Sequence, residues 1–220
     1  MRCVRVHFTK TGRMIYVSHL DVNRMMTRAV RRAELPMWYT EGFNPHPYIA
    51  FALPLSLGQS SECEFMDIKI ETDMTNEEIK KRLSPVMPEG VRILSVGEPD
   101  GNINEITAAS YSVNLEFASY EDAEKFYSGT ISALEGDELM AEKMGKKGHR
   151  KVLKQVNLIE QIYKKTVALD GCCVNLELTV AAGNTVNLNP ALLTETLEKQ
   201  IGIIPESQKI TRTGIIFKGE

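Results

Sequence analysis

Long apolar runs are missing from this chain. None approaches the ~18 residues that a membrane-spanning helix needs. The segment Met1–Lys10 alternates like a strand and lacks the apolar centre of a signal peptide. We therefore expect a cytoplasmic protein with no membrane partner. Cysteine is scarce, and its four copies show no CxxC or CxxxCxxC spacing, so we expect buried free thiols: Cys3, Cys63, Cys172 and Cys173.

Sequence motifs of common active sites are absent as well. The chain has no GxGxxG, P-loop, GxSxG or HExxH motif, and no RNA-recognition signature. His19, Asp21, Glu41 and His46 include enough ligand types for a metal site, but their spacing matches no known signature. We predict no metal in this chain, and the sequence names no reaction.

What is present is the composition of a folded protein with polarised charge. The 220 residues are 43% hydrophobic and 25% charged, which suits one large domain or two small ones. The net charge of -3 hides local extremes. Residues 98–142 hold eleven acids and one lysine, whereas residues 143–154 hold six cations and no acid. Such local potential favours binding to a polyanion more than the total charge suggests.

The first half of the chain has the order strand, helix, strand, strand, helix, strand. Strands are predicted at residues 2–9, 48–53, 62–71 and 91–96 from alternation and β-branched content. Ser18 with Asp21, and Thr75 with Glu78, are capping signatures that predict two helix starts. Pro36 ends the first helix. Residues 97–106 have the composition of a linker.

A similar order follows in the second half. Strands are predicted at 111–117, 172–180 and 210–217, and helices at 120–134 and 190–201, the latter capped by Asn189. Residues 138–144 favour a strand, and residues 152–169 are ambiguous. We predict an α+β fold of two tandem ferredoxin-like (βαββαβ) units with antiparallel sheets. The domains are residues 1–98 and residues 107–220, with a basic insertion near 143–154.

The first helix has two opposed faces. Arg24, Arg28 and Arg31 cluster opposite the apolar residues, with Arg32 between the two groups. Guanidinium groups at one-turn spacing suit phosphates, although an ordinary solvated face explains them too. His19, in the first turn, is a candidate general base that the helix N-terminus would keep neutral. A half-buried histidine bonded to the backbone is the structural alternative.

The loop EGFNPHP, residues 41–47, combines rigidity with polar side chains. Its two prolines restrain Asn44 and His46, and Glu41 begins it. We predict that Glu41, Asn44 and His46 contact a ligand or RNA, and His46 is the second catalytic candidate; a purely structural turn remains the alternative. Trp38, Tyr39 and Phe43 flank the loop and can stack on unpaired bases or join the core.

The basic stretch KMGKKGHRKVLK, residues 143–154, is predicted to be a flexible cationic loop. Its candidates for phosphate contact are Lys146, Lys147, Arg150 and Lys151. A solvated loop without a ligand is the alternative.

The run from Ser18 to Ile68, SHLDVNRMMTRAVRRAELPMWYTEGFNPHPYIAFALPLSLGQSSECEFMDI, resembles the N-terminal signature of the radical-SAM-linked proteins, a family of unknown function. The element Thr211–Gly214 also fits. The resemblance implies a radical SAM protein as partner, which carries the iron–sulfur cluster and SAM. This chain has no CxxxCxxC motif, so we expect that it is not the radical enzyme itself and needs no cofactor of its own. In architecture the chain is also similar to repeat-associated CRISPR RNA endonucleases, without their C-terminal glycine-rich motif.

Three functions therefore stay open. The first is an accessory module that binds RNA or a ribonucleoprotein substrate for a radical SAM protein. The second is a small metal-independent RNA-processing enzyme that uses a histidine base. The third is a pure protein–protein interaction partner.

Overall fold

The chain forms two compact units. The computed structural model describes residues 1–147, 150–183 and 186–219, and for 144–147 and 150–152 it describes the backbone alone. Unit 1 comprises Met1–Ile106 and Arg212–Glu220, and unit 2 comprises Thr107–Thr211. The last nine residues, which the sequence analysis assigned to the second domain, therefore group with the first.

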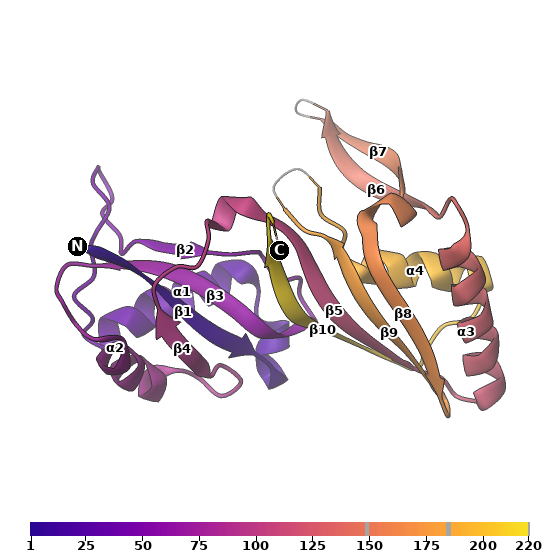
Figure 1. The fold of residues 1–220 in the computed structure, drawn as a ribbon, viewed down its shortest axis with the longest axis horizontal. Coiled ribbons are helices and arrows are strands. Elements are labelled where there is room, and N and C mark those ends of the chain that lie inside the picture. The colour runs from indigo at the N-terminus through magenta and orange to yellow at the C-terminus, as the bar shows by residue number, and fades with distance from the viewer. Residues whose placement is uncertain (148–149, 184–185, 220) are drawn as a thin grey trace. The chain divides into compact units, whose positions relative to one another are not determined.

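Unit 1 is an antiparallel sheet with two helices on one of its faces (Figure 1). Strand β1 pairs with both β3 and β4, β2 pairs with β3, and all these pairings are antiparallel. The part of β10 that belongs to unit 1 follows β3 in strand order. The elements are β1 (Arg2–Lys10), α1 (His19–Arg32), β2 (Ile49–Phe51), β3 (Ser60–Ile70), α2 (Asn76–Leu83), β4 (Ile93–Gly97) and β10 (Ser207–Phe217).

Both predicted helix starts in unit 1 are confirmed. The Ser18 hydroxyl accepts a hydrogen bond from the Asp21 amide at 3.2 Å, and Thr75 does the same for the Glu78 amide at 3.2 Å. Each bond satisfies one of the amides that a helix start leaves unpaired. Helix α1 ends at Arg32, four residues before Pro36, and Glu34 takes a left-handed conformation with φ of 52° just beyond it.

The core of unit 1 lies between the helices and one face of the sheet. Apolar side chains from both layers are fully buried there: Val4, Val6, Phe8, Val22, Met26, Ala29, Val30, Met66, Ile68, Ile70, Ile79 and Leu83. The face of α1 predicted from the 3.6-residue period is thus the buried one. Strand β3 is buried on both faces, which leaves Glu64 and Asp67 inside the protein.

Unit 2 is also an antiparallel sheet with two helices. Strand β9 pairs with β5 and β8, and β10 follows β5 in strand order. Phe117 and Phe126 pack with ring centroids 4.9 Å apart between the sheet and α3. The elements are β5 (Ile106–Glu116), α3 (Tyr120–Glu135), β6 (Met140–Lys147), β7 (Arg150–Asn157), β8 (Ile162–Asp170), β9 (Cys173–Ala181) and α4 (Pro190–Ile201).

The basic stretch differs from its prediction. The sequence predicted a flexible loop over residues 143–154, but β6 and β7 pair there as an antiparallel two-stranded sheet. The register sets Lys143 opposite Lys154 and Lys147 opposite Arg150. Like charges in facing positions oppose pairing, so charge pattern alone argued against strands. The α+β class is confirmed, with four α-helices and antiparallel sheets in the described residues.

Candidate functional site

The exposed face of α1 carries all four of its arginines. Arg24, Arg28, Arg31 and Arg32 are exposed, whereas the apolar residues between them are buried or half-buried. A surface groove of about 380 Å³ lies along this face, lined by Asp21, Arg24, Met25, Arg28 and Arg32. The amphipathic pattern therefore places a row of guanidinium groups over one concave surface.

The three arginines that line the groove are not the three that the sequence analysis grouped. Arg32 replaces Arg31 in the groove, and its Nη2 donates a hydrogen bond of 2.7 Å to the Val86 carbonyl oxygen. The Arg31 guanidinium lies instead 5.9 Å from the centre of the Tyr39 ring. Position on the helix gives the direction of the Cα–Cβ bond only, and a long side chain then turns toward its nearest partner.

Arg24 and Arg28, two of the arginines that line the groove, make few contacts with the rest of the protein. Arg24 Nη1 lies 3.1 Å from Asp21 Oδ1, with both side chains more than half exposed. Solvent screens such an exposed pair, so it contributes little to stability. Within the described part of the chain the Arg28 guanidinium has no hydrogen-bond partner. The guanidinium groups of Arg24 and Arg28 can therefore turn toward an anion in the groove without breaking strong contacts within the protein.

His19 is the first residue of α1 and is half-buried. Its ring packs edge-on against Phe51, with 5.2 Å between centroids. Burial lowers the pKa of His19, the Glu64 carboxylate opposes this change, and the Lys10 charge adds to it. A neutral imidazole at pH 7 follows, which a general base requires.

His19 lies beside two buried charged residues, Lys10 and Glu64, and a third, Arg212, is bonded to Glu64. The sequence analysis singled out none of the three for a site. Lys10, Glu64 and Arg212 are 3%, 6% and 3% exposed. Arg212 Nη1 donates to Glu64 Oε1 at 2.8 Å, and the same guanidinium donates to the carbonyls of Leu53 and Pro54. The sequence holds only a weak signal for them, because Glu64 is one of four charged residues in the segment ECEFMDIKI, and its need for a partner follows only from its burial.

Lys10 is the least satisfied member of this cluster. Its Nζ donates one long hydrogen bond, of 3.5 Å, to the Ile15 carbonyl oxygen. Burial lowers the pKa of Lys10, Glu64 raises it, and Arg212 lowers it. Lys10, His19 and Glu64 line one small cavity, closed by the apolar side chains of Phe8, Val22, Phe51 and Leu55. At about 10 Å³, the cavity has room for one water molecule at most.

The stability of unit 1 is expected to rise with pH below about 6.5. The pKa of His19 is lower in the folded protein than its ordinary value of about 6.5, so the unfolded chain binds more protons in that range. The contribution is present above pH 6.5 and is lost as pH falls toward the folded pKa. Urea unfolding at pH 5.5 and 7.5 measures it, and His19→Gln should reduce the difference.

A second half-buried histidine, His7, also contributes to the pH dependence of stability. Burial lowers the pKa of His7 too, so a residual pH dependence of the same sign is expected in His19→Gln. An unchanged pH dependence in His19→Gln would contradict the role of His19. A flat profile in the unaltered protein would contradict both.

The loop of residues 41–46 is closed at its base. The Thr40 amide donates to the His46 carbonyl at 2.9 Å, and the His46 amide donates to Thr40 Oγ1 at 3.2 Å. His46 Nδ1 lies 3.1 Å from both Thr40 Oγ1 and the Asn44 carbonyl oxygen. Every residue from Glu41 to His46 is exposed. His46 therefore holds the loop together through Nδ1, and its catalytic role stays a prediction.

Aromatic and cationic side chains alternate beside this loop. Lys69 Nζ lies 5.0 Å from the centre of the Trp38 ring and 4.4 Å from that of Tyr48. Trp38 and Tyr48 are half-buried, whereas Tyr39 is 41% exposed. Phe43 is fully exposed at 112%. None of the three aromatic residues that flank the loop is fully buried, and their stacking on unpaired bases stays a prediction.

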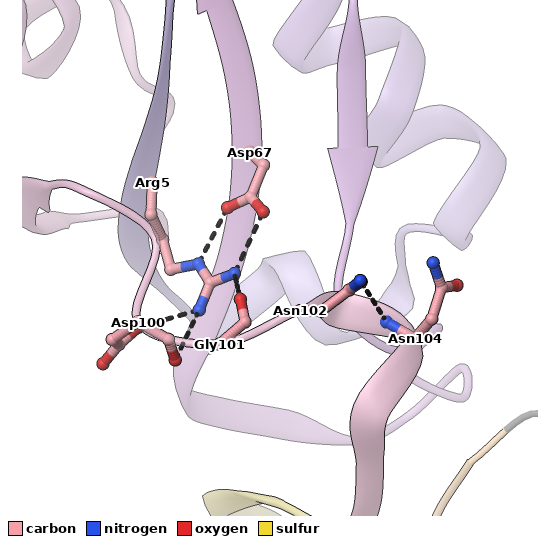
Figure 2. A network of polar contacts seen from close by, with 6 residues as sticks. All are labelled: Arg5, Asp67, Asp100, Gly101, Asn102 and Asn104. Carbon is pink, nitrogen blue, oxygen red and sulfur yellow. Dashed lines mark hydrogen bonds and ion pairs between the residues drawn. The ribbon is translucent and has the colours of Figure 1, made fainter.

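The predicted linker, residues 97–106, is pinned to the sheet by Arg5. This side chain is fully buried, and its Nε and Nη2 donate to the two carboxylate oxygens of Asp67 at 2.8 and 3.0 Å. Nη1 donates to Asp100 Oδ1 at 2.7 Å, and Nη2 donates to the Gly101 carbonyl at 2.8 Å (Figure 2). Its guanidinium carbon also lies 4.2 Å from the centre of the Phe65 ring. Every Arg5 nitrogen is used within the protein, so this network is structural.

The four basic candidates of the hairpin lie outside the described side chains. The structure gives backbone positions in β6 and β7 for Lys146, Lys147, Arg150 and Lys151, with Lys146 opposite Lys151. Their predicted contact with phosphate stays a prediction. At the base of the hairpin, Lys143 Nζ donates to the Asn187 carbonyl at 2.8 Å.

The described residues hold neither a metal-binding cluster nor a membrane-spanning helix. There, no three His, Cys, Asp or Glu side chains are grouped to hold a metal ion. In the same part of the chain, no helix combines the length and apolar character needed to cross a membrane. The four cysteines are free, and burial raises the pKa of the Cys63 thiol to about 11. None of the four is fully buried, against the expectation: Cys3, Cys63 and Cys173 are half-buried, and Cys172, in the turn before β9, is exposed.

Comparison with known proteins gives a family and a fold relative. The family model described as "Uncharacterized protein conserved in bacteria (DUF2344)" matches residues 3–190. A chain in the crystal structure of a Cbf5-Nop10-Gar1 complex matches 99% of this chain with a TM-score of 0.52 and 10% identity. This chain covers 50% of that chain, and the likeness concerns the fold alone.

A second structural match carries no argument. It is the crystal structure of an unknown protein from Galdieria sulphuraria, with 10% identity and 98% of both chains covered, but a TM-score of only 0.27. No curated protein matches the sequence.

Proposed function

We propose that this chain, which belongs to the DUF2344 family of uncharacterized proteins conserved in bacteria, is an accessory module that binds RNA or a ribonucleoprotein substrate for a radical SAM protein. The observation that carries the RNA part is the groove on α1, where Arg24, Arg28 and Arg32 line one concave surface. Guanidinium groups donate paired hydrogen bonds to phosphate oxygens. Spacing of one helical turn lets successive groups follow a phosphate backbone.

The proposed fold is two ferredoxin-like units. In unit 1 the strand order β4-β1-β3, with β2 also on β3, supports this reading. In unit 2 the order β10-β5-β9-β8 has the same form once the separate β6–β7 hairpin is set aside. The hairpin then occupies the place of the predicted basic insertion, between α3 and β8.

RNA binding is expected to weaken on the order of tenfold or more in Arg24→Glu/Arg28→Glu, because two phosphate contacts are removed and their charges reversed. The plot of log Kd against log salt should lose about 1.4 of its slope, at ~0.7 per contact with a single strand. Fluorescence anisotropy with labelled tRNA and rRNA fragments measures both quantities when the salt concentration is varied from about 50 to about 300 mM.

The matched control is Lys164→Glu/Lys199→Glu. Both lysines are exposed in unit 2 and outside the groove, and the change in net charge is the same. This variant should retain most of the affinity. Equal weakening in the two double variants would mean that total charge, and not the groove, governs binding. Absence of RNA binding at low salt would reject the RNA part of the proposal.

The radical SAM partner rests only on the resemblance of residues 18–68 and of Thr211–Gly214 to the radical-SAM-linked proteins. The cluster and SAM would lie on that partner, since this chain has no CxxxCxxC motif. A tagged chain is expected to co-purify with a radical SAM protein from its native cell, identified by mass spectrometry. A complex weakened by Asn44→Ala/His46→Ala would favour the alternative of a pure protein–protein interaction partner, with residues 41–47 as its docking point. Recovery of no radical SAM protein would remove this part of the proposal.

A further inference from the structure

The loop of residues 41–46 holds a phenylalanine ring away from the rest of unit 1. Phe43 is 112% exposed, and no residue of the loop is buried. Folding usually gains about 1.5–3 kcal/mol from burying such a ring. Here that gain is absent, although hydrogen bonds between Thr40 and His46 fix the base of the loop. The backbone that carries this exposed ring is held at its base, so less entropy is lost when the loop binds something else.

The neighbours of Phe43 are hydrogen-bonding groups. Glu41 and Asn44 are exposed on either side of it. A carboxylate accepts hydrogen bonds from exocyclic amino groups of bases, and a carboxamide both donates and accepts. One stacking face with polar groups beside it matches the chemistry by which proteins hold an unpaired base.

Cations continue this surface toward α1. The Arg31 guanidinium lies 5.9 Å from the centre of the Tyr39 ring, and Tyr39 stands at the base of the loop, bridged to Pro47. Lys69 lies over Trp38 and Tyr48. A partner protein with an apolar pocket for Phe43 would not need these charges, whereas a nucleic-acid strand supplies a phosphate beside every base. The charge pattern therefore favours a single strand over a protein.

We infer that the loop of residues 41–46 binds an unpaired base of single-stranded RNA, with Phe43 stacked on the base and Glu41 and Asn44 at its edge. This inference rests on the proposed function and names its substrate class. Paired bases are already stacked on their neighbours and present no free face to Phe43. Single strands are therefore preferred over duplexes.

The test uses the full chain and two probes. One is a fluorescein-labelled 12-nucleotide single strand carrying one 2-aminopurine, and the other is the same strand annealed to its complement. Phe43→Ala is expected to weaken single-strand binding about 5- to 150-fold, the range for removing one base–aromatic stack. Phe43→Trp should restore affinity, whereas Phe43→Leu should not. Stacking should quench 2-aminopurine fluorescence in the unaltered protein and in Phe43→Trp only.

Tyr163→Ala, at an exposed aromatic residue of unit 2, is the control and should bind as the unaltered protein does. Equal affinity of Phe43→Ala and the unaltered protein for the single strand would overturn the inference. So would unquenched 2-aminopurine, or a duplex bound as tightly as the single strand. If Arg24→Glu/Arg28→Glu still weakens both probes, the proposed function survives that failure. Loss of a bound protein in Phe43→Ala, with RNA binding unchanged, would make the loop a protein contact instead.

Discussion

Arg5→Met is expected to lower the free energy of unfolding by about 3–5 kcal/mol, because it leaves the Asp67 carboxylate buried without its cation. It also releases the turn at Asp100 and Gly101, which Arg5 holds against the sheet (Figure 2). Urea unfolding followed by the fluorescence of Trp38, the single tryptophan and a residue of unit 1, measures the loss.

Two further variants separate the parts of this network. Arg5→Met/Asp67→Leu should regain much of the loss, since replacing a whole buried ion pair by apolar side chains is often neutral. Asp100→Asn should cost less than about 1 kcal/mol, because the Asp100 side chain is 77% exposed. A cost below about 0.5 kcal/mol for Arg5→Met, typical of surface positions, would refute the assignment of Arg5 as a structural clamp.

Glu64→Gln is expected to have an effect of similar size, about 3–5 kcal/mol, on the other face of the same sheet. Glu64 is the carboxylate bonded to Arg212 and the group that raises the pKa of Lys10. Its loss leaves two buried cations facing each other without an anion. Urea unfolding at pH 7 gives the magnitude.

The pH dependence of Glu64→Gln tests the involvement of Lys10. The folded pKa of Lys10 lies below its ordinary value, so the unfolded chain binds more protons and stability rises with pH. Removing Glu64 lowers that pKa further and should steepen the rise between pH 7 and 10. Adding Lys10→Met should remove the steepening and recover part of the stability.

Glu62→Gln is the matched control, an exposed glutamate on the same strand, and it should change stability by less than about 0.5 kcal/mol. Equal effects of Glu62→Gln and Glu64→Gln would show that the buried pair is not special. A pH profile unaltered by Lys10→Met would exclude Lys10 as the source of the steepening.

Helix starts and buried faces were the most predictable features of this chain. Ser18, Thr75 and Asn189 act on amides two or three residues away, and each caps its helix as predicted. The buried face of α1 follows from periodicity over fourteen residues. All of these interactions are local, so the residues that decide them stand together in the sequence.

The β6–β7 hairpin was less predictable for a physical reason. Its register brings like charges opposite each other, against the usual cross-strand preference. Glycines at 145 and 148 within a cationic run are typical of a loop. Hydrogen bonding between the two paired strands favours the hairpin, and a pattern of single residues along the chain does not represent that pairing.

The candidate site, like the fold, has parts that the sequence predicts and parts that it does not. The sequence by itself determined the arginine face of α1 and the closed, polar loop after it, because both depend on helix periodicity and on prolines close in the chain. Only the tertiary structure decided that Arg32 and not Arg31 lines the groove, since Val86 and Tyr39 draw the two side chains apart. It alone joined Glu64 to Arg212 across 148 positions and placed Glu64 beside Lys10 and His19. No local pattern encodes such a pairing: two buried charges find each other only because the sheet that excludes water from both also brings them into contact.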